Sequence, residues 1–295
     1  MIRIQLLGPT VVDVDGVVFT ASQLGGVKPR QILEMLAVEL GSPVAKDRLA
    51  EQLWEDQPPA SYVATLESYV CVLRRRLGLE RGSALVTTNS GYLLDPERVS
   101  VDLVEVRALL SPERTASADT TLARTESALD LLGAELLASE PYAAWANRTR
   151  ELVDDEIVAA CTHAAHLANA AGQHERAVAL AQPAVGRGLF TEAPCQELMR
   201  AFAAQGRRGE ALKTYADLRA RMVDDLGVEP GPVSRRLYLD ILGRTSGVRG
   251  EASDHHEIRT LLRLLRQALD AGAHLDNLGE FAISEMTLLL DRQAG

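Results

Sequence analysis

The sequence predicts a mainly α-helical protein, with an N-terminal part that mixes strands and helices and an all-helical part after it. Of its 295 residues, 46% are hydrophobic and only 4% are aromatic, and Ala and Leu are abundant. This composition favours helices packed on helices. Alternating apolar residues with turn signals occur in residues 2–20 and 84–95, whereas apolar residues at helical spacing follow in most of the remaining chain.

The N-terminal part begins with two or three short antiparallel strands in residues 2–20. Asp15-Gly16 separates two apolar runs there and is a typical hairpin signal. A helix is predicted from about Arg30 to Leu40, where Gly41-Ser42-Pro43 ends it. A second helix is predicted over residues 46–54, before the turn formed by Pro58-Pro59.

A third helix and a hairpin complete this part. Ser61 is predicted to cap the helix, which runs to about Leu77, and Gly78 is its predicted C-cap. Two strands around Asn89-Ser90-Gly91 form the hairpin. Three helices followed by a β-hairpin are the layout of a winged helix-turn-helix, in which the third helix is the recognition helix. Its predicted buried face, at 100° per residue, holds Val63, Leu66, Val70, Leu73 and Leu77.

The chain from about residue 101 to residue 242 shows helical spacing throughout. The predicted helices cover residues 102–110, 122–137, 145–171, 174–187, 195–205, 209–225 and 233–242. Two stretches within them, LANAAGQHERAVALAQPAV and AFAAQGRRGEALKTYADLR, resemble each other. Their separation of about 34–35 residues is the period of helix hairpins of the tetratricopeptide (TPR) type.

The expected organisation is therefore a winged-helix domain in residues 1–98, a TPR-like helical domain in residues 101–245, and a linker with C-terminal helices in residues 246–295. Two tail helices are predicted, at 257–271 and 278–290. The leucine stripe of the first is interpreted either as a face that docks on the helical domain or as a surface for dimerisation or a partner.

Three adjacent arginines, Arg74-Arg75-Arg76, end the predicted recognition helix. Cations favour the last turn of any helix, so the run indicates DNA binding only because of its place between the turn and the hairpin. The net charge is −10, and residues 1–98 carry ten Lys and Arg against twelve Asp and Glu, a net of −2 that leaves −8 for the remainder. DNA binding must therefore rest on a local basic face, because phosphate attraction reaches only about 8–10 Å in salt.

The exposed face of the predicted recognition helix combines short polar side chains with arginines. Short side chains allow close approach to a major groove, and arginines reach phosphates or guanine edges. The candidate DNA contacts are Thr65, Ser68, Tyr69, Val72, Arg74, Arg75 and Arg76 on this helix, Thr87, Thr88, Asn89 and Tyr92 in the hairpin, and Lys28 and Arg30 before the first helix. Trp54 and Tyr92 are also candidates for the core.

The same sequence also suits other functions. The repeated hairpins also suit a helical scaffold that binds a peptide or a small ligand, and the helical domain could combine both roles. His163 with His166, or His255-His256-Glu257, could suggest a metal enzyme, but no third ligand and no nucleophile–base pair accompanies them. The three cysteines, Cys71, Cys161 and Cys195, are far apart and odd in number and form no C-x-x-C pair, so a zinc or disulfide framework is not expected.

The sequence accordingly predicts a protein that is not an enzyme and that needs no cofactor or metal. No apolar segment follows a basic start, and no run approaches 18 apolar residues, so neither a signal peptide nor a membrane span is expected. The expected location is the cytoplasm, in association with the nucleoid.

Several stretches together resemble the Streptomyces antibiotic regulatory protein (SARP) family. KPRQILEMLA, DRLAEQLW, TLESYVCVLRRRLG and GYLL are similar to its OmpR-type winged helix. ALDLLGAEL, LANAAGQHERAV, ELMRAFAAQGRRGEALKTYADLR and DDLGVEPGP are similar to its bacterial transcriptional activation domain. The resemblance covers about residues 1–243. Two departures, Cys71 and Val72, stand where polar or basic residues are frequent in the family.

This resemblance implies a pathway-specific activator of a secondary-metabolite gene cluster, such as one for an antibiotic. It implies binding to double-stranded promoter DNA with direct repeats, and contact with RNA polymerase holoenzyme including its principal sigma factor. Two protomers in tandem, a homodimer on DNA, would place the repeats about 10–10.5 bp apart. The resemblance also implies groove or phosphate contacts by Thr65, Ser68, Tyr69, Val72, Arg74 and Arg75, and wing contacts by Thr87 and Tyr92.

Overall fold

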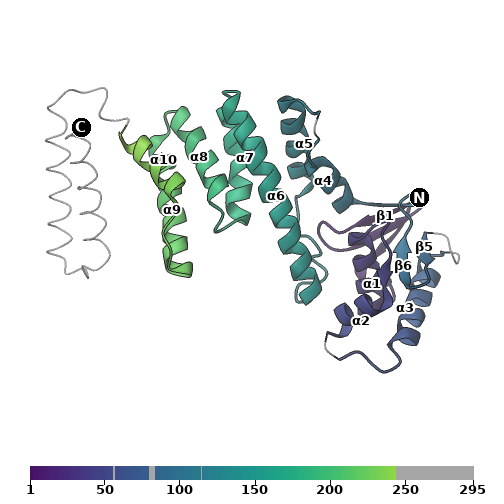
Figure 1. Cartoon of the computed structure of the whole chain (residues 1–295). Helices are drawn as coiled ribbons and strands as arrows, with labels where there is room; N and C mark the ends of the chain where they lie inside the picture. Colours follow the sequence, from purple (N-terminus) through teal and green to yellow (C-terminus); the bar gives the residue numbers. More distant parts are fainter. Residues whose placement is uncertain (56, 80–83, 114, 244–295) are drawn as a thin grey trace, which may run out of the picture. The chain divides into compact units, whose positions relative to one another are not determined.

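The computed structural model describes residues 1–55, 57–79, 84–113 and 115–243, and Figure 1 shows them as a mainly helical chain with strands in the N-terminal part. Residues Met1–Tyr238 form one compact unit, and the described residues from Leu239 to Gly243 lie outside it. The predicted tail helices and the pair His255-His256 lie outside the described residues.

A four-stranded sheet opens the fold. It comprises β1 (Ile2–Gln5), β2 (Val11–Val14), β3 (Val17–Thr20) and β7 (Val99–Val101), in the order β3-β2-β1-β7. The predicted hairpin is confirmed: Asp15 and Gly16 both have positive φ, and the Gly16 amide donates to Asp13 Oδ1 at 2.7 Å. β7 pairs in parallel with β1. Residues 99–101 therefore form a strand of the N-terminal sheet, and the helices begin after it.

Three helices and a second sheet follow β3, after a short 3-10 turn at Ala21–Gln23. The helices are α1 (Val27–Val38), α2 (Lys46–Trp54) and α3 (Tyr62–Arg76), close to the predicted bounds. The second sheet contains β4 (Val44–Ala45), β5 (Leu85–Thr87) and β6 (Gly91–Leu94) in the order β4-β6-β5. Fully buried leucines from each layer, including Leu36, Leu49, Leu73, Leu85 and Leu94, form the core between helices and strands.

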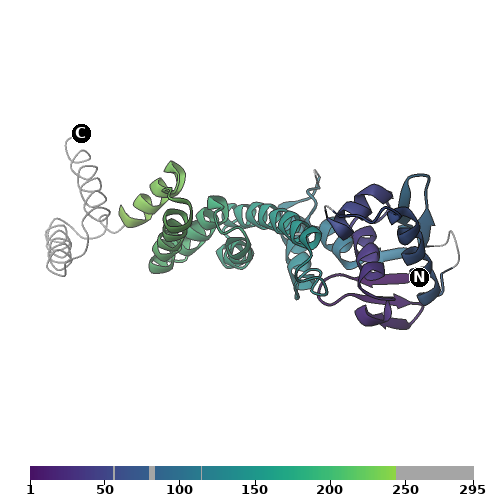
Figure 2. The ribbon, with the colours of Figure 1, turned by 90° about the horizontal axis from the view of Figure 1, so that it is seen from below.

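The helical part contains α4 (Asp102–Leu110), α5 (Ala118–Leu131), α6 (Ala144–Ala170), α7 (His174–Arg187), α8 (Glu192–Ala204), α9 (Arg208–Leu226) and α10 (Pro232–Gly243). From α4 to α9 each helix packs on the next, as Figures 1 and 2 show. No helix among the described residues is long and apolar enough to cross a membrane.

The two stretches of similar sequence correspond to two helix hairpins with the same turn. Gly172 after α6 and Gly206 after α8 have φ of +72° and +75°. The amide of the next residue closes each turn at 2.9 Å, from Gln173 to the carbonyl of Ala168 and from Arg207 to the carbonyl of Phe202. Each turn needs a residue in the left-handed region, which glycine adopts without strain. The TPR-like fold class is thus confirmed.

The predicted helix at 122–137 is wrong at its C-terminal end, because α5 stops at Leu131. The following segment leaves the helix and pairs with the chain after β1: the amide of Leu137 donates to the carbonyl of Leu6 at 2.7 Å, and the amide of Gly8 donates to that of Glu135 at 2.9 Å. Leu137 is fully buried there. Burial of this leucine and its pairing with the distant segment after β1 replace the helical continuation.

Candidate DNA-binding surface

Helix α3 is the candidate recognition helix, and its inner face holds it on the core. Leu66, Val70 and Leu73 are buried as predicted, and Leu77 is buried just after the helix. Val63 is 38% exposed, so its predicted burial is wrong; it stands at the margin of the apolar stripe, in the first turn. Ser61 occupies the N-cap position but makes no side-chain cap, and only its carbonyl accepts hydrogen bonds, from the amide and hydroxyl of Thr65.

The end of α3 is fixed immediately after the three arginines. Gly78 has φ of +64°, the amide of Leu79 donates to the carbonyl of Arg74 at 2.8 Å, and the amide of Gly78 donates to that of Arg75 at 3.4 Å. These bonds form a Schellman motif, in which a glycine in the left-handed region ends the helix. The motif places all three arginines in the last turn, where the helix dipole favours positive charge.

The three arginines have different surroundings. Arg74 is half-buried, and its Nη2 donates to the carbonyl of Leu85 at 2.7 Å and to Thr87 Oγ1 at 2.9 Å. Arg74 therefore joins α3 to strand β5. Arg75 and Arg76 are exposed, and neither forms an ion pair with another described residue. These two guanidinium groups are the ones available to an acidic polymer.

The remaining candidate DNA-contact residues on α3 lie either beside Arg75 or along one flank of the helix. Ser68 and Cys71 are exposed beside Arg75, and the Ser68 hydroxyl donates to the carbonyl of Ala64 at 3.0 Å. The flank holds Thr65, Tyr69 and Val72, which are half-buried. The ring of Tyr69 stacks on that of Trp54, with centroids 6.4 Å apart. Val72 faces Gly25, where an added Cβ would lie 2.4 Å from Val72 Cγ1, so only glycine fits.

The wing is the hairpin of β5 and β6. Its turn is closed by the amide of Thr88, which donates to the carbonyl of Gly91 at 2.9 Å, and by the amide of Gly91, which donates to Thr88 Oγ1 at 3.0 Å. A Cβ at Gly91 would lie 1.8 Å from the carbonyl oxygen of Val44, so strand β4 can pair there only with a glycine. Thr87 and Asn89 are exposed at this wing, and Thr88 is half-buried.

Three sequence candidates lie away from this surface. Tyr92 is 2% exposed, and burial raises the pKa of its phenol. The Nζ of Lys28 donates to the carbonyl of Leu53. Arg30 Nε lies 2.9 Å from Glu140 Oε1, in the segment before α6. Sequence reasoning missed Glu140, since nothing near it in the sequence points to a partner on α1.

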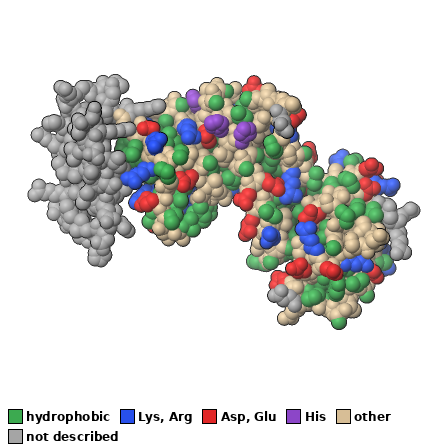
Figure 3. Space-filling view, in the orientation of Figure 1, with side chains coloured by type: hydrophobic (Ala, Val, Ile, Leu, Met, Phe, Trp, Pro, Cys, Tyr) green, Lys and Arg blue, Asp and Glu red, His purple; other side chains and the backbone are tan. Residues whose placement is uncertain are grey.

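The charges of the described residues are mixed. In the face shown in Figure 3, Lys and Arg side chains alternate with Asp and Glu side chains, with no continuous basic field over the N-terminal part. Attraction to DNA must therefore come from a few well-placed groups, since screening limits each to about 8–10 Å. Among the described residues no group of three or more His, Cys, Asp or Glu could hold a metal ion. His166 instead lies against Glu197 on α8, with Nδ1 3.1 Å from Oε1.

Comparison with known families identifies both parts of the chain. Residues 25–94 match the family described as transcriptional regulatory protein, C terminal, and residues 101–242 match the bacterial transcriptional activator domain. These two matches follow one another along the chain, as the sequence resemblance implies.

Similar proteins come from Mycobacterium and Streptomyces species. The transcriptional regulatory protein MoaR1 of Mycobacterium tuberculosis is 29% identical over 250 residues, 82% of this chain and 79% of MoaR1. The regulatory protein DnrI of Streptomyces peucetius is 27% identical over 258 residues, 83% of this chain and 94% of DnrI. The transcriptional regulator RedD of Streptomyces coelicolor is 28% identical, over 82% of this chain and 71% of RedD.

A solved structure of Mycobacterium tuberculosis EmbR, in complex with a low affinity phosphopeptide, has the same fold. It superposes with a TM-score of 0.66 and 27% identity, covering 90% of this chain and 71% of the EmbR chain. The order of the two matched regions and the relatives that align over about four fifths of the sequence give one conclusion: the chain belongs to the Streptomyces antibiotic regulatory protein family of DNA-binding transcriptional activators.

Proposed function

We propose that this protein activates a secondary-metabolite gene cluster by binding direct repeats at its promoters and recruiting RNA polymerase. In this proposal residues 1–98 are the DNA-binding domain and residues 101–245 contact the polymerase, in the cytoplasm and on the nucleoid. The observation that carries it is the exposed pair Arg75 and Arg76 on the last turn of α3, beside a wing anchored by Arg74.

Helix α3 enters the major groove with Ser68, Cys71 and Arg75 on the side that faces the DNA. Small side chains there let the helix approach the bases, while Arg75 and Arg76 bind phosphates or guanine O6 and N7. The wing supplies backbone contacts from Thr87, Thr88 and Asn89, and Thr65, Tyr69 and Val72 lie at the edge of the interface. Lys28, Arg30 and Tyr92 are left outside it, because their polar groups are engaged or buried.

Two protomers bind in tandem on one face of the DNA. Repeats about 10–10.5 bp apart place equivalent surfaces on the same side of the duplex. The part of the chain after residue 98, with a net charge of −8, is repelled by DNA and is suited to basic surfaces of RNA polymerase holoenzyme and its principal sigma factor. Recruitment requires only modest energies, since about 1.4 kcal/mol changes occupancy tenfold.

Footprinting on the promoters of the neighbouring gene cluster, with and without RNA polymerase holoenzyme, tests the proposal. We expect protection of two direct repeats by the protein alone and extension of the footprint when polymerase is added. A single unrepeated site would contradict the tandem arrangement. An unchanged footprint and unchanged transcription in the presence of polymerase would contradict recruitment.

A second candidate is a helical scaffold that binds a peptide or a small ligand, favoured by the two equivalent hairpins α6–α7 and α8–α9. If the protein is such a scaffold, DNA binding should not depend on the residues of α3. A mobility-shift assay with the double variant Arg75→Ala/Arg76→Ala separates the two: undiminished binding to the promoter fragment would favour the scaffold.

A further inference from the structure

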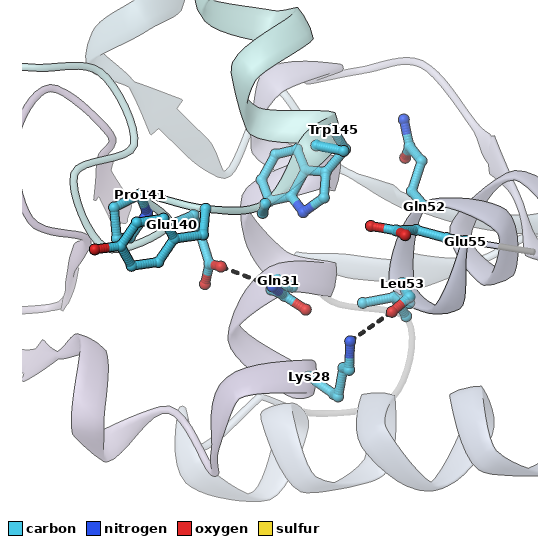
Figure 4. A pocket seen from close by; sticks show the side chains of 11 residues that line it. Lys28, Gln31, Gln52, Leu53, Glu55, Glu140, Pro141 and Trp145 are labelled. Carbon is cyan, nitrogen blue, oxygen red and sulfur yellow. Dashed lines mark hydrogen bonds between the residues drawn. The ribbon is translucent and has the colours of Figure 1, made fainter. Parts of the chain in front are cut away.

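A cavity of about 300 Å³ lies where the winged helix meets the segment that leads into α6. Its walls are Lys28 and Gln31 of α1, Gln52, Leu53 and Glu55 at the end of α2, and residues 140–145 (Figure 4). All of these residues belong to the compact unit Met1–Tyr238. A cavity of this size accommodates a small organic molecule.

Two buried polar atoms of residues that line the cavity have no hydrogen-bond partner. Trp145 is 7% exposed, and its Nε1 is buried without an acceptor. Gln31 is also 7% exposed, and its Oε1 is buried without a donor. Buried polar groups in proteins are nearly always paired, so two such atoms beside one cavity call for an explanation.

A neighbouring bond fixes the orientation of the Gln31 amide. The side-chain amide nitrogen of Gln31 donates to Glu140 Oε2 at 2.6 Å, which leaves its oxygen as the unpaired atom. Figure 4 shows this bond and shows the indole nitrogen of Trp145 directed into the ring of lining side chains. The cavity therefore offers one donor, the indole N–H of the buried Trp145, and one acceptor, the Gln31 oxygen, whose amide is held by Glu140.

The other lining groups define the charge and shape of a ligand. Lys28 already donates to the carbonyl of Leu53, and Glu140 is held by Arg30 and Gln31. The carboxylates of Glu55 and Glu140 outnumber the single ammonium group, so an anion is disfavoured. Pro141, Tyr142 and Trp145 add flat apolar surface, which suits a planar ring.

We propose that this cavity binds a small uncharged molecule that carries a carboxamide or lactam on a planar ring. Its carbonyl oxygen accepts from Trp145 Nε1, and its N–H donates to Gln31 Oε1. Because the walls come from both sides of the Arg30–Glu140 contact, such a ligand bridges the winged helix and the segment before α6. Any effect on DNA binding rests on the function proposed above, whereas binding in the cavity does not.

Titration of the full chain with para-fluorobenzamide tests this proposal. The protein has two tryptophans, Trp54 and Trp145, so heteronuclear NMR reports both indole N–H groups in one spectrum. We expect a saturable shift of the Trp145 signal with a Kd of about 1 mM, as is usual for a ligand of this size, and a smaller change for Trp54. The anion para-fluorobenzoate is expected to give no shift at the same concentration.

Two cavity variants and one matched control localise the binding. Fluorine NMR of the probe is expected to show at least fivefold weaker binding to Gln31→Met and to Trp145→Phe, since each removes one hydrogen bond. Gln57→Met, at an exposed position after α2, should bind like the unaltered protein, and circular dichroism checks that all variants fold. Three results would each overturn the proposal and leave a cavity that holds water only. They are the absence of a saturable Trp145 shift at probe concentrations well above about 1 mM, equal binding of the benzoate, and full affinity of Gln31→Met for the probe.

Discussion

Arg30 of α1 and Glu140 of the segment before α6 form an ion pair across 110 positions of the sequence, with Arg30 Nε 2.9 Å from Glu140 Oε1. Arg30 Nη2 also donates to the carbonyl of Ser139 at 3.1 Å, and Gln31 donates to the other oxygen of Glu140. The side chains of Arg30 and Glu140 are only 14% and 5% exposed. This contact joins the winged helix to the chain that enters the long helix α6.

Replacing Arg30 by Met is expected to lower the free energy of unfolding by about 3–5 kcal/mol, because it leaves a buried carboxylate without its cation. Urea denaturation measures the loss. The control is Arg48→Met, which breaks the ion pair between Arg48 and Glu39. These two side chains are 53% and 37% exposed. Exposed pairs contribute less than about 1 kcal/mol. Equal losses of free energy of unfolding in the two variants would show that the buried Arg30 pair stabilises the fold no more than an exposed pair does.

Glu34 makes the stability depend on pH. It is fully buried, and burial raises the pKa of its carboxyl from 4.5 to about 8; Glu140 adds to the rise, while the hydroxyl of Thr10 and the charge of Arg30 oppose it. Between pH 4.5 and 8 the unfolded state has lost this proton and the folded state retains it. The folded state then binds more protons, so Glu34 lowers the free energy of unfolding by up to about 1.4 kcal/mol per pH unit as the pH rises.

The stability that the neutral Glu34 carboxyl contributes is fully present below pH 4.5, and it is lost as the pH rises through about 8. Glu34→Gln stays neutral at every pH and keeps an oxygen acceptor for Thr10. Its stability relative to the unaltered protein is expected to increase from pH 5 to pH 8, measured by urea denaturation at several pH values. Parallel curves for the two proteins would mean that Glu34 titrates near its ordinary pKa in the folded state.

Arg75 and Arg76 are expected to contribute to DNA affinity without contributing to folding. Since neither forms an ion pair with another described residue, Ala at either position leaves no carboxylate unpaired. Each replacement should weaken binding to the promoter fragment about fivefold to tenfold at physiological salt and reduce the salt slope by about 1. Fluorescence anisotropy at several salt concentrations measures both quantities.

The matched control for these arginines is Arg207→Ala, in the turn before α9, where the arginine pairs with Glu210 on the surface. Its DNA affinity and salt slope should equal those of the unaltered protein. If Arg75→Ala behaves like Arg207→Ala, α3 is not the DNA-binding helix.

Arg74 is expected to act by holding the wing. Lys at this position keeps the charge but cannot donate to both the carbonyl of Leu85 and the hydroxyl of Thr87 in the same geometry. We expect Arg74→Lys to lose about 1–2 kcal/mol of stability and to bind DNA more weakly. Arg75→Lys should retain its stability and most of its affinity. Identical behaviour of the two Lys variants, in thermal unfolding and anisotropy, would contradict the separate roles.

The local patterns of the sequence predict most helices closely. The bounds of Lys46–Trp54, Asp102–Leu110 and His174–Arg187 agree with the structure, because apolar spacing and end signals act within a few residues. Gly78, Gly172 and Gly206 mark helix ends where glycine adopts positive φ. Where a distant segment competes, prediction fails: Leu137 leaves the helical pattern to pair with Leu6, a partner that no window of sequence contains.

The candidate site divides in the same way. Its helix, its arginines and its wing could be predicted from order and composition. The separate roles of Arg74, Arg75 and Arg76 could not, since they depend on which side chain faces strand β5. Lys28 and Arg30 look equally basic in the sequence, and only the position of Leu53 and Glu140 shows that they are engaged.

The sequence by itself determined the order of elements, the repeated helix hairpins and the place of the basic turn, because each depends on the spacing of neighbouring residues. Only the tertiary structure decided which guanidinium groups stay free among the described residues, that Glu34 is held as a buried acid, and that a cavity forms beside Trp145. The physical reason is that burial and charge pairing depend on contacts between residues outside any local window of sequence, as between Arg30 and Glu140, which lie 110 positions apart.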